Sequence, residues 1–157
     1  MYSRTVYTML EETAIAFPHK PALQQPVGNG QYRAYTWSQV RDTVQWIAVG
    51  LRTIGVEPCD MIALQSETRA EFYVADLGVM STGAIAAALY TALPLAEQAH
   101  ALRACEAKVV LVENPKVMRG LQTALQEAAD QRKWILLTGE AEGVLTLAEL
   151  IAAGKKK

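Results

Sequence analysis

The sequence predicts one α/β domain over residues 1–157, with a mainly parallel sheet, helices on both faces of the sheet, and a small β-hairpin near the N-terminus. The first observation is that short, entirely apolar runs alternate along the chain with amphipathic segments of helical period. Strands that are apolar on both faces are typical of parallel sheets covered by helices on both sides. The second observation is composition, because 157 residues that are 51% hydrophobic and 20% charged suit one globular domain with its own core.

The N-terminal segment of the chain predicts a helix followed by a hairpin. Apolar residues at near-helical spacing from Val6 to Ile15 predict a helix that stops at Pro18. Two short strands are expected at 22–25 and 32–35. The segment Gly28-Asn29-Gly30 between them supplies residues that tolerate the positive φ of a tight turn.

A long amphipathic helix is expected next. Thr36, with Gln39 three residues later, forms a capping box, which is typical of a helix N-terminus. The apolar face that follows steps by three or four residues, through Val40, Val44, Ile47, Leu51 and Ile54. Gly55 ends this helix.

The rest of the chain alternates between strands and helices. Four apolar strands of the parallel sheet are expected at 61–65, 84–89, 108–112 and 133–137. Helices are expected at 69–80, 95–107, 115–131 and 145–153. Pro115 falls in the first turn of a helix, where its missing N–H costs no hydrogen bond.

One uncharged window needs a decision between a membrane span and a buried strand. No Asp, Glu, Lys or Arg lies between Asp76 and Glu97, and about 20 uncharged residues can cross a bilayer as a helix. Gly83, Thr91 and Pro94 interrupt the window where a continuous helix tolerates them poorly. We interpret it as a helix end, a turn, a strand and a loop, and we expect no transmembrane segment.

Charge and cysteine usage narrow the class of protein. The net charge is −1 and the basic residues are spread along the chain, which argues against a nucleic-acid-binding protein. The run Lys155–Lys157 is interpreted as a solvated tail. Cys59 and Cys105 have no metal-ligand spacing and are expected to be free thiols in a cytoplasmic protein. The first residues lack the apolar stretch of a signal peptide.

Glycine spacing gives no nucleotide site. The segment GLRTIGVE at 50–57 has the two glycines of a phosphate loop but lacks the Lys and Ser or Thr that reach phosphate and Mg²⁺. It also ends a helix, so Gly55 is interpreted as a helix cap. Gly28 and Gly30 lack the third glycine of a dinucleotide fingerprint and are assigned to the hairpin turn.

Polar residues give no catalytic or metal site either. Ser66 and Ser81 do not lie in a nucleophile-elbow sequence, and the remaining candidates are interpreted as surface or cap residues; they are His19, His100, Glu11, Glu12, Glu140 and Glu142. No catalytic, cofactor-binding or metal-binding residue is therefore assigned, and no bound cofactor is expected for this chain.

The order of segments resembles a known family. Residues 35–114, YTWSQVRDTVQWIAVGLRTIGVEPCDMIALQSETRAEFYVADLGVMSTGAIAAALYTALPLAEQAHALRACEAKVVLVEN, are similar to the N-terminal region of AMP-forming acyl-CoA ligases. The segments AFPHKPAL and KWILLTGEAEGVLTLAELIAAGKKK also fit, the latter resembling the long-chain fatty acid subgroup. Two residues depart from the family pattern, because Cys59 stands where Gly is usual and Ala88 lies near the usual Pro.

The resemblance implies a reaction that needs more than this chain. Members activate a carboxylate with ATP and Mg²⁺ to an acyl-adenylate and then transfer the acyl group to coenzyme A. Their phosphate loop, adenine-binding segment, ribose-binding aspartate and C-terminal lysine follow the region matched here, so no catalytic residue is carried over. The resemblance thus implies an N-terminal fragment of a long-chain fatty acid–CoA ligase that is inactive alone.

Partners and alternatives follow from this interpretation. The expected partners are the remainder of the ligase chain and a second copy in a homodimer, and the parent substrate is a fatty acid. The parent is expected to be cytoplasmic and peripheral at the membrane. Two alternatives stay open: a free-standing, non-catalytic α/β module with a binding or regulatory role, and an unrelated flavodoxin-like domain.

Overall fold

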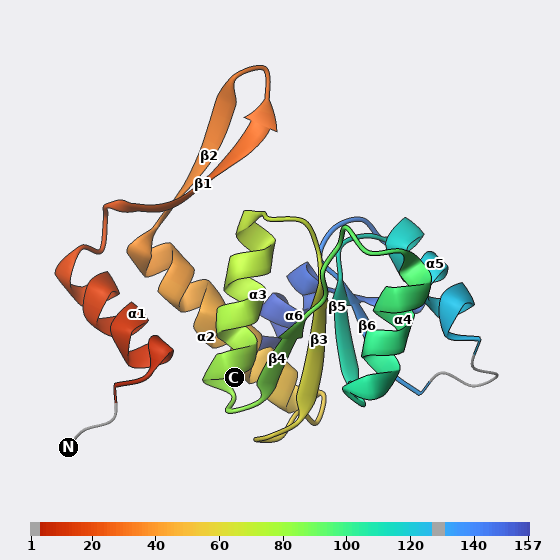
Figure 1. The fold of residues 1–157 in the computed structure, drawn as a ribbon. Coiled ribbons are helices and arrows are strands. Elements are labelled where there is room, and N and C mark those ends of the chain that lie inside the picture. Colours follow the sequence, from red (N-terminus) through yellow and green to blue (C-terminus); the bar gives the residue numbers. More distant parts are fainter. Residues whose placement is uncertain (1–3, 127–130) are drawn as a thin grey trace.

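The computed structural model describes residues 4–126 and 131–157 and contains a five-stranded parallel sheet (Figure 1). The strands lie in the order β4-β3-β5-β6-β7 and all neighbours are parallel. Their bounds are β3 Met61–Gln65, β4 Ile85–Ala88, β5 Val109–Val112, β6 Lys133–Leu136 and β7 Leu145–Thr146. This arrangement confirms the predicted fold class and the four predicted strands.

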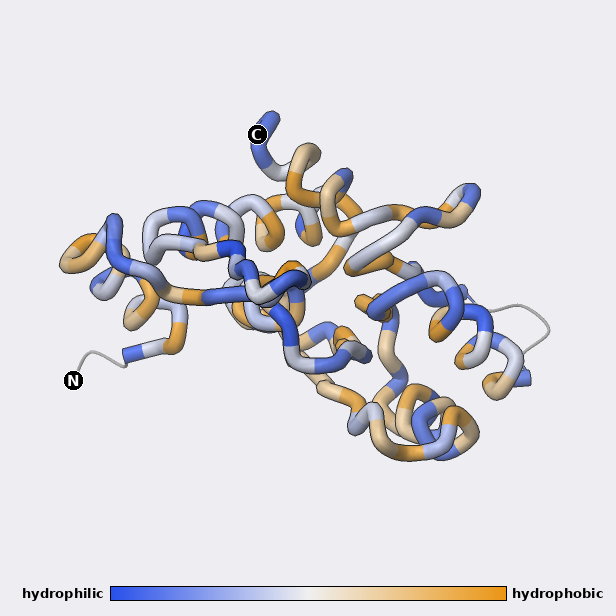
Figure 2. The backbone as a smooth tube through the Cα atoms, turned by 90° about the horizontal axis from the view of Figure 1, so that it is seen from above, coloured by the Kyte–Doolittle hydropathy of each residue, from blue (hydrophilic) through white to orange (hydrophobic). Residues whose placement is uncertain are grey.

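Helices cover both faces of this sheet. One face is covered by α2 (Trp37–Thr53), α3 (Ala70–Ser81) and α6 (Leu147–Lys155), and the other by α4 (Leu95–Ala104) and α5 (Pro115–Leu125). Viewed from above, hydrophobic and hydrophilic residues alternate along the helices (Figure 2). Helices α2 and α5 each present an apolar stripe to the sheet, as amphipathic periodicity requires.

The buried residues form two clusters, one on each face of the sheet, because successive side chains along a strand point to opposite faces. Ile62 and Leu64 of β3 pack with the α2–α3–α6 layer, whereas Ala63 between them packs with the α4–α5 layer. Successive strand side chains point to opposite faces, so a strand buried on both sides must be apolar throughout. Burying a Leu or Ile side chain stabilises the fold by about 1.5–3 kcal/mol, and these contacts hold the layers together.

The predicted caps position the long helices. Thr36 and Gln39 form the expected capping box at the start of α2, with the Thr36 hydroxyl accepting from the Gln39 N–H at 3.3 Å. The Asn114 side chain accepts from the N–H groups of Lys116 and Val117 and caps α5, whose first residue is Pro115. These side chains satisfy N–H groups that a helix N-terminus leaves unpaired.

The N-terminal helix and hairpin lie beside the sheet. Helix α1 (Val6–Ala16) packs on α2 and α3, while β1 (Pro21–Gly28) and β2 (Gln31–Thr36) form an antiparallel hairpin that extends away from the body (Figure 1). Asn29 and Gly30 form the turn with φ of 51° and 70°. Two consecutive positive φ values define a type I′ turn, which confirms the predicted role of this segment.

Several element boundaries differ from the sequence predictions. The uncharged window is divided between α3, β4 and the loop before α4, so the prediction against one continuous helix is confirmed. Strand β7 was not predicted, because two residues are too short to give a periodic signal. Because β7 occupies the first two residues of the predicted last helix, that helix begins at Leu147, two residues after its predicted start.

Two predicted helices are too long at their C-termini. Helix α4 ends at Ala104, because Glu106 adopts a φ of 51°, and α5 ends at Leu125, because Gln126 adopts a φ of 54°. Positive φ is incompatible with a continuing α-helix. The predicted extension of α5 through 127–130 lies outside the described residues.

Strand β4 is less buried than its apolar sequence predicts. It lies at the edge of the sheet, and Ile85 is 49% exposed. The local sequence does not distinguish an edge strand from a central one, because the difference depends on strand order. Among the described residues, every helix is too short or too polar to cross a membrane.

Candidate functional site

The parallel sheet has two rims with different chemistry. At the amino edge, where strands begin, the helices end, so their last carbonyl groups and the negative ends of their dipoles gather there. At the carboxyl edge, where strands end, the next helices begin. Ligands of open α/β sheets usually bind outside the carboxyl ends of the strands, where the strand order reverses. Each rim is therefore a candidate site.

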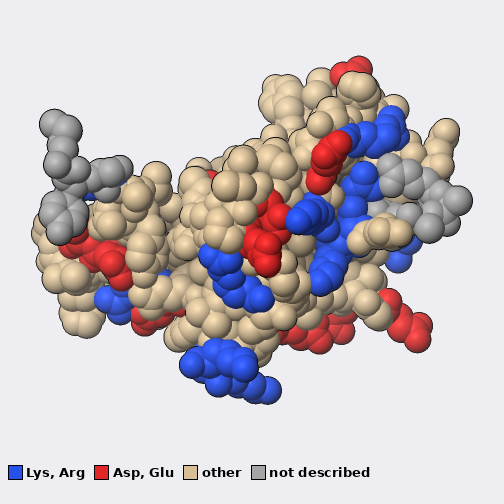
Figure 3. Space-filling model, turned by 90° about the horizontal axis from the view of Figure 1, so that it is seen from below, with Lys and Arg blue, Asp and Glu red and all other residues tan. Residues whose placement is uncertain are grey.

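A hollow of about 590 Å³ lies at the amino edge, between the end of α2 and the starts of β5 and β6. Lys and Arg side chains gather on this underside of the molecule, with Asp and Glu among them (Figure 3). Arg103, Lys108, Arg132 and Lys133 line the hollow together with Asp60 and Glu106. The excess of cations makes an anion site the first hypothesis to test.

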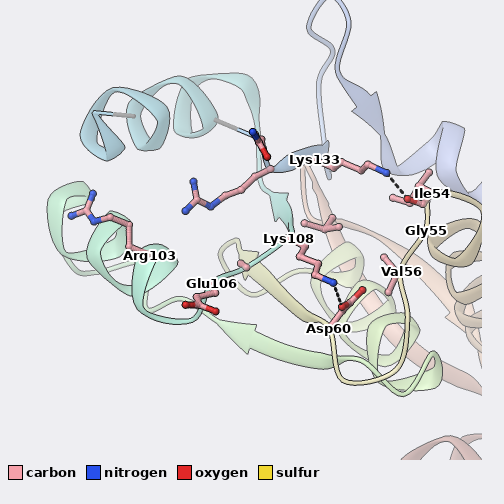
Figure 4. Close-up of a pocket in the computed structure, with 12 residues that line it drawn as sticks. Ile54, Gly55, Val56, Asp60, Arg103, Glu106, Lys108 and Lys133 are labelled. Carbon is pink, nitrogen blue, oxygen red and sulfur yellow. Dashed lines mark hydrogen bonds and ion pairs between the residues drawn. The ribbon is translucent and has the colours of Figure 1, made fainter. Parts of the chain in front are cut away.

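Two of the cations around this hollow bind carbonyl groups at the ends of helices. Lys133 Nζ donates to the Ile54 carbonyl at 2.5 Å, and Arg103 donates to the Leu125 carbonyl at 3.2 Å (Figure 4 shows the first contact). Ile54 is the C-terminal cap residue of α2, and Leu125 is the last residue of α5. Cations at helix C-termini are favourable because they satisfy the last carbonyls and the dipole.

Asp60 and Lys108 form the ion pair of this rim, with 2.5 Å between Lys108 Nζ and Asp60 Oδ1 (Figure 4). The Lys108 hydrogen bond, followed by the Glu57 N–H, lowers the pKa of the Asp60 carboxyl. The same hydrogen bond raises the pKa of Lys108. The Asp60 side chain is only 9% exposed, whereas that of Lys108 is 67% exposed. The lysine thus neutralises a carboxylate that fixes the turn before β3.

These contacts assign a structural role to the amino edge. Lys108, Lys133 and Arg103 each bind a carboxylate or a helix-end carbonyl of the chain itself. Binding an anion here would compete with bonds that hold the ends of α2 and α5. We therefore interpret this part of the basic hollow as the capped underside of the sheet.

The strand order reverses between β3 and β5, which places the expected ligand position at their carboxyl ends. Glu113, which follows β5, accepts from the Glu67 backbone N–H at 2.8 Å and, at 3.4 Å, shares the Ser66 hydroxyl proton with the Glu67 carbonyl. Thr138 donates its hydroxyl to the Glu113 carbonyl at 2.7 Å. Side chains after β3, β5 and β6 thus form one hydrogen-bonded row along the carboxyl edge.

Glu113 was not assigned to a site from the sequence. The signal available was its position directly after a buried strand, but a single carboxylate there does not indicate a chemistry. Ser66 is 6% exposed, and its hydroxyl donates to the Glu67 carbonyl at 2.9 Å. It therefore helps to fix the turn after β3.

The segment with phosphate-loop spacing belongs to a helix. Gly50 and Leu51 lie within α2, and Gly55 follows its end with a φ of 89°. A Cβ at Gly50 would lie 2.4 Å from the Leu150 carbonyl oxygen, so this glycine allows α6 to approach. The backbone N–H groups of the helical part of this segment donate within α2 and do not face a ligand.

The other predicted surface residues are distributed over the molecule. His19, His100, Glu140 and Glu142 are exposed, His19 before β1, His100 on α4 and the two glutamates in the loop between β6 and β7, and Glu11 accepts from the Tyr7 hydroxyl. Cys59 is exposed and Cys105 is half-buried, and both are free thiols. In residues 4–126 and 131–157, no group of three or more His, Cys, Asp or Glu could hold a metal ion.

Residues 10–155 match the family described as "AMP-binding enzyme". The chain belongs to this family. The resemblance that the sequence carries over residues 35–114 is confirmed at this level. Membership also removes the alternative of an unrelated flavodoxin-like domain, because the match extends over nearly the whole chain.

The relatives include one short protein and one long ligase. The chain is 31% identical over 115 residues to "Uncharacterized protein Rv1549" of Mycobacterium tuberculosis, covering 73% of this chain and 64% of the relative. It is 29% identical over 111 residues to "Long-chain-fatty-acid--[acyl-carrier-protein] ligase AEE15, chloroplastic" of Arabidopsis thaliana, covering 71% of this chain and 15% of the relative.

A solved structure supports the fold. The crystal structure of the anthranilate CoA ligase AuaEII in complex with anthranoyl-AMP superposes with a TM-score of 0.80 and 23% identity. The superposition covers 95% of this chain and 28% of the ligase. The chain therefore spans about a quarter of that ligase and, as in the Arabidopsis relative, only a fraction of the longer protein.

Proposed function

We propose that this chain is the N-terminal region of a long-chain fatty acid–CoA ligase. The whole protein would activate a fatty acid with ATP and Mg²⁺ to an acyl-adenylate and pass the acyl group to coenzyme A. The observation that carries this proposal is the family match over residues 10–155, combined with a fold match that covers 95% of this chain and 28% of a CoA ligase. The Arabidopsis relative, named as a long-chain-fatty-acid ligase, supports the substrate class.

Residues 4–126 and 131–157, which the structure describes, do not fit a nucleotide or Mg²⁺ on their own. The glycine spacing at 50–55 belongs to α2, and the carboxylates of the described residues form no metal cluster. The cations at the amino edge bind helix-end carbonyls and Asp60. Stabilising the charge that develops on a transferring phosphate requires fixed donors and a metal ion. We therefore assign ATP, Mg²⁺ and coenzyme A to the parent protein, and the chain alone is expected to be inactive.

Release of pyrophosphate tests this proposal. The 157-residue chain, mixed with a long-chain fatty acid, ATP and Mg²⁺, is expected to release no more pyrophosphate than a blank without protein. The longer chain, if the coding sequence continues after Lys157 into a Gly/Thr-rich loop, is expected to release pyrophosphate only when fatty acid is present. Turnover by the 157-residue chain alone would contradict the proposal.

A free-standing, non-catalytic binding or regulatory module is the second candidate. It is favoured by the Mycobacterium relative, which is itself short because 115 matched residues make up 64% of it. The coding sequence after Lys157 separates the two candidates. A stop codon there supports the module, and an open frame into a Gly/Thr-rich loop supports the ligase.

The proposed partners are the remainder of the ligase and a second copy of the chain. Strand β4 has an outer edge with no neighbouring strand in the described sheet, and the hairpin β1–β2 stands away from the body. Such edges promote pairing with another strand. A fatty acid substrate is also consistent with the proposed location of the parent in the cytoplasm and at the membrane surface.

A further inference from the structure

A hollow of about 280 Å³ lies between α2, α3 and α6, at the foot of the hairpin. Val40, Val74 and Leu147 line it, and these side chains are 3%, 8% and 4% exposed. Trp46 and Ile151 add half-buried apolar surface. We call it the three-helix hollow. An apolar recess of this kind favours an apolar occupant over water.

The rim of the three-helix hollow carries one cation that no carboxylate neutralises among the described residues. Lys155 lies with its Nζ 4.1 Å from the centre of the Trp46 ring and remains exposed. Glu71 also lines the rim, but Arg69 Nε binds its carboxylate at 2.8 Å. Lys156 and Lys157, both exposed, follow Lys155. The rim is therefore positive beside an apolar interior.

We propose that the three-helix hollow binds a medium-chain alkyl carboxylate, with the alkyl chain inside and the carboxylate at Lys155. A volume of 280 Å³ equals that of about nine water molecules, which suits a short alkyl chain better than a folded segment. Charge complementarity selects an anionic head group. This site is separate from the acyl-adenylate chemistry proposed above and holds whether or not the longer chain is a ligase.

A second copy of the chain fits this hollow less well. A two-fold contact places the same patch of both copies together. The Lys155–Lys157 run of each copy would then approach the other, and like charges across an interface are unfavourable. An anionic amphiphile carries a charge opposite to that of Lys155–Lys157, so these residues attract its head group.

Titration of the 157-residue chain with decanoate, below its micelle concentration, tests the site. The chain has three tryptophans, whose indole N–H signals are followed by NMR. A Trp46→Phe variant identifies the Trp46 signal. Decanoate is expected to shift the Trp46 signal and to leave Trp134, which lies in the α4–α5 core cluster, unchanged. Decyltrimethylammonium, with the same alkyl chain and the opposite charge, is expected to bind more weakly.

Matched variants separate the interior of the site from its rim. Ala70→Leu places a larger side chain in the hollow and is expected to abolish the Trp46 shift. Lys155→Gln is expected to weaken decanoate binding about two- to fivefold, as for an exposed ion pair. Lys116→Gln makes the same charge change at an exposed position on α5 and is expected to leave binding unchanged. Thr43→Leu, also on the hollow's lining, serves if Ala70→Leu does not fold.

Four outcomes would overturn the proposal. The first is a Trp46 signal that decanoate does not shift. The second is unchanged binding in both space-filling variants. The third is equal binding of the cationic amphiphile. The fourth is a Trp46 shift that follows protein concentration alone, which would assign the hollow to a second copy.

Discussion

Gly154 of α6 lies directly against the backbone of Trp46 in α2, so closely that a Cβ at Gly154 would be 1.9 Å from the Trp46 carbonyl oxygen. Gly50 of α2 has the same role in the next turn of the contact, where a Cβ would be 2.4 Å from the Leu150 carbonyl oxygen. Two glycines thus let the backbones of α2 and α6 approach each other. This contact fixes the C-terminal helix over the core and brings Lys155 to the Trp46 ring.

Gly154→Ala is therefore expected to destabilise the chain, although alanine is the better helix former by about 1 kcal/mol. The methyl group meets backbone atoms, which cannot move without separating two helices, and overpacking of this kind costs about 1–3 kcal/mol. Urea unfolding followed by circular dichroism measures the change.

Gly120→Ala in α5 is the matched control. A Cβ there would meet only the tip of Leu95, 2.7 Å away, and Leu95 is 39% exposed and can move aside. Its stability is expected to stay constant or to rise by a few tenths of a kcal/mol. Equal effects at Gly154 and Gly120 would contradict the close contact between α2 and α6.

The chain is expected to be less stable with Cys59 than with glycine at this position. It adopts a φ of 68° in the turn before β3, and its backbone N–H donates to the Gly83 carbonyl at 2.9 Å. A residue with a side chain is strained in this left-handed conformation, so Cys59→Gly is expected to raise the free energy of unfolding by about 0.5–1 kcal/mol. The urea midpoint measures this change.

Cys59→Ala distinguishes backbone strain from an effect of the thiol. Alanine keeps the Cβ and is expected to match the wild-type chain in stability, since Cys59 is exposed. A gain in Cys59→Ala as large as that in Cys59→Gly would assign the effect to the sulfur atom instead.

The Asp60–Lys108 pair gives the stability a defined pH dependence. The pKa of Asp60 is lowered in the folded state, so its contribution is present above the unfolded pKa near 4 and is lost as the pH falls through the lower folded pKa. The pKa of Lys108 is raised, so its contribution is present below about pH 10 and is lost as the pH rises through the folded pKa.

Asp60→Asn removes this ion pair and tests the pH dependence. The variant is expected to lose stability at pH 7, and its difference from the wild-type chain should shrink as the pH falls from about 4 through the lower folded pKa of Asp60, because the carboxyl is protonated first in the unfolded and then in the folded chain. Urea unfolding at several pH values measures the difference, with Glu142→Gln at an exposed site as control. A difference that is constant from pH 7 down to pH 2 would refute this account.

Local patterns were sufficient to predict most elements of the fold. Thr36 and Gln39 marked the start of α2, and Asn29 and Gly30 marked the hairpin turn, because each acts through its own backbone neighbourhood. The exposure of Ile85 could not be predicted in this way, since it depends on β4 lying at the edge of the sheet. Strand β7 is equally non-local, because two residues become a strand only by pairing with β6.

The candidate sites were harder to predict than the fold. Lys133 and Ile54 are far apart in sequence, and only the folded chain shows that this lysine caps α2. The three-helix hollow joins residues of the hairpin foot, α2, α3 and α6, which no single segment reveals. Glu113 and Ser66 meet at the carboxyl edge for the same reason, because strand order brings β3 next to β5.

Self-association is the remaining expectation from sequence, and the structure supplies a specific variant to test it. β4 is an edge strand with Ile85 49% exposed, and further apolar side chains are exposed on α1 and at the hairpin tip, namely Ile15, Val27 and Tyr32. Edges and apolar patches of this kind promote association, most simply as a two-fold dimer. Sedimentation across a concentration series is expected to show an apparent mass that rises above 17.1 kDa.

Ile85→Lys is expected to shift this equilibrium toward the monomer, because a charge on an edge strand opposes strand pairing. Ile15→Lys introduces the same charge on α1, at a side chain that is 74% exposed, and is expected to have little effect if dimers form through β4. If only Ile15→Lys dissociates the dimer, the contact lies on α1 instead. A wild-type chain that stays at 17.1 kDa at every concentration would show that its helices cover the core without a second copy.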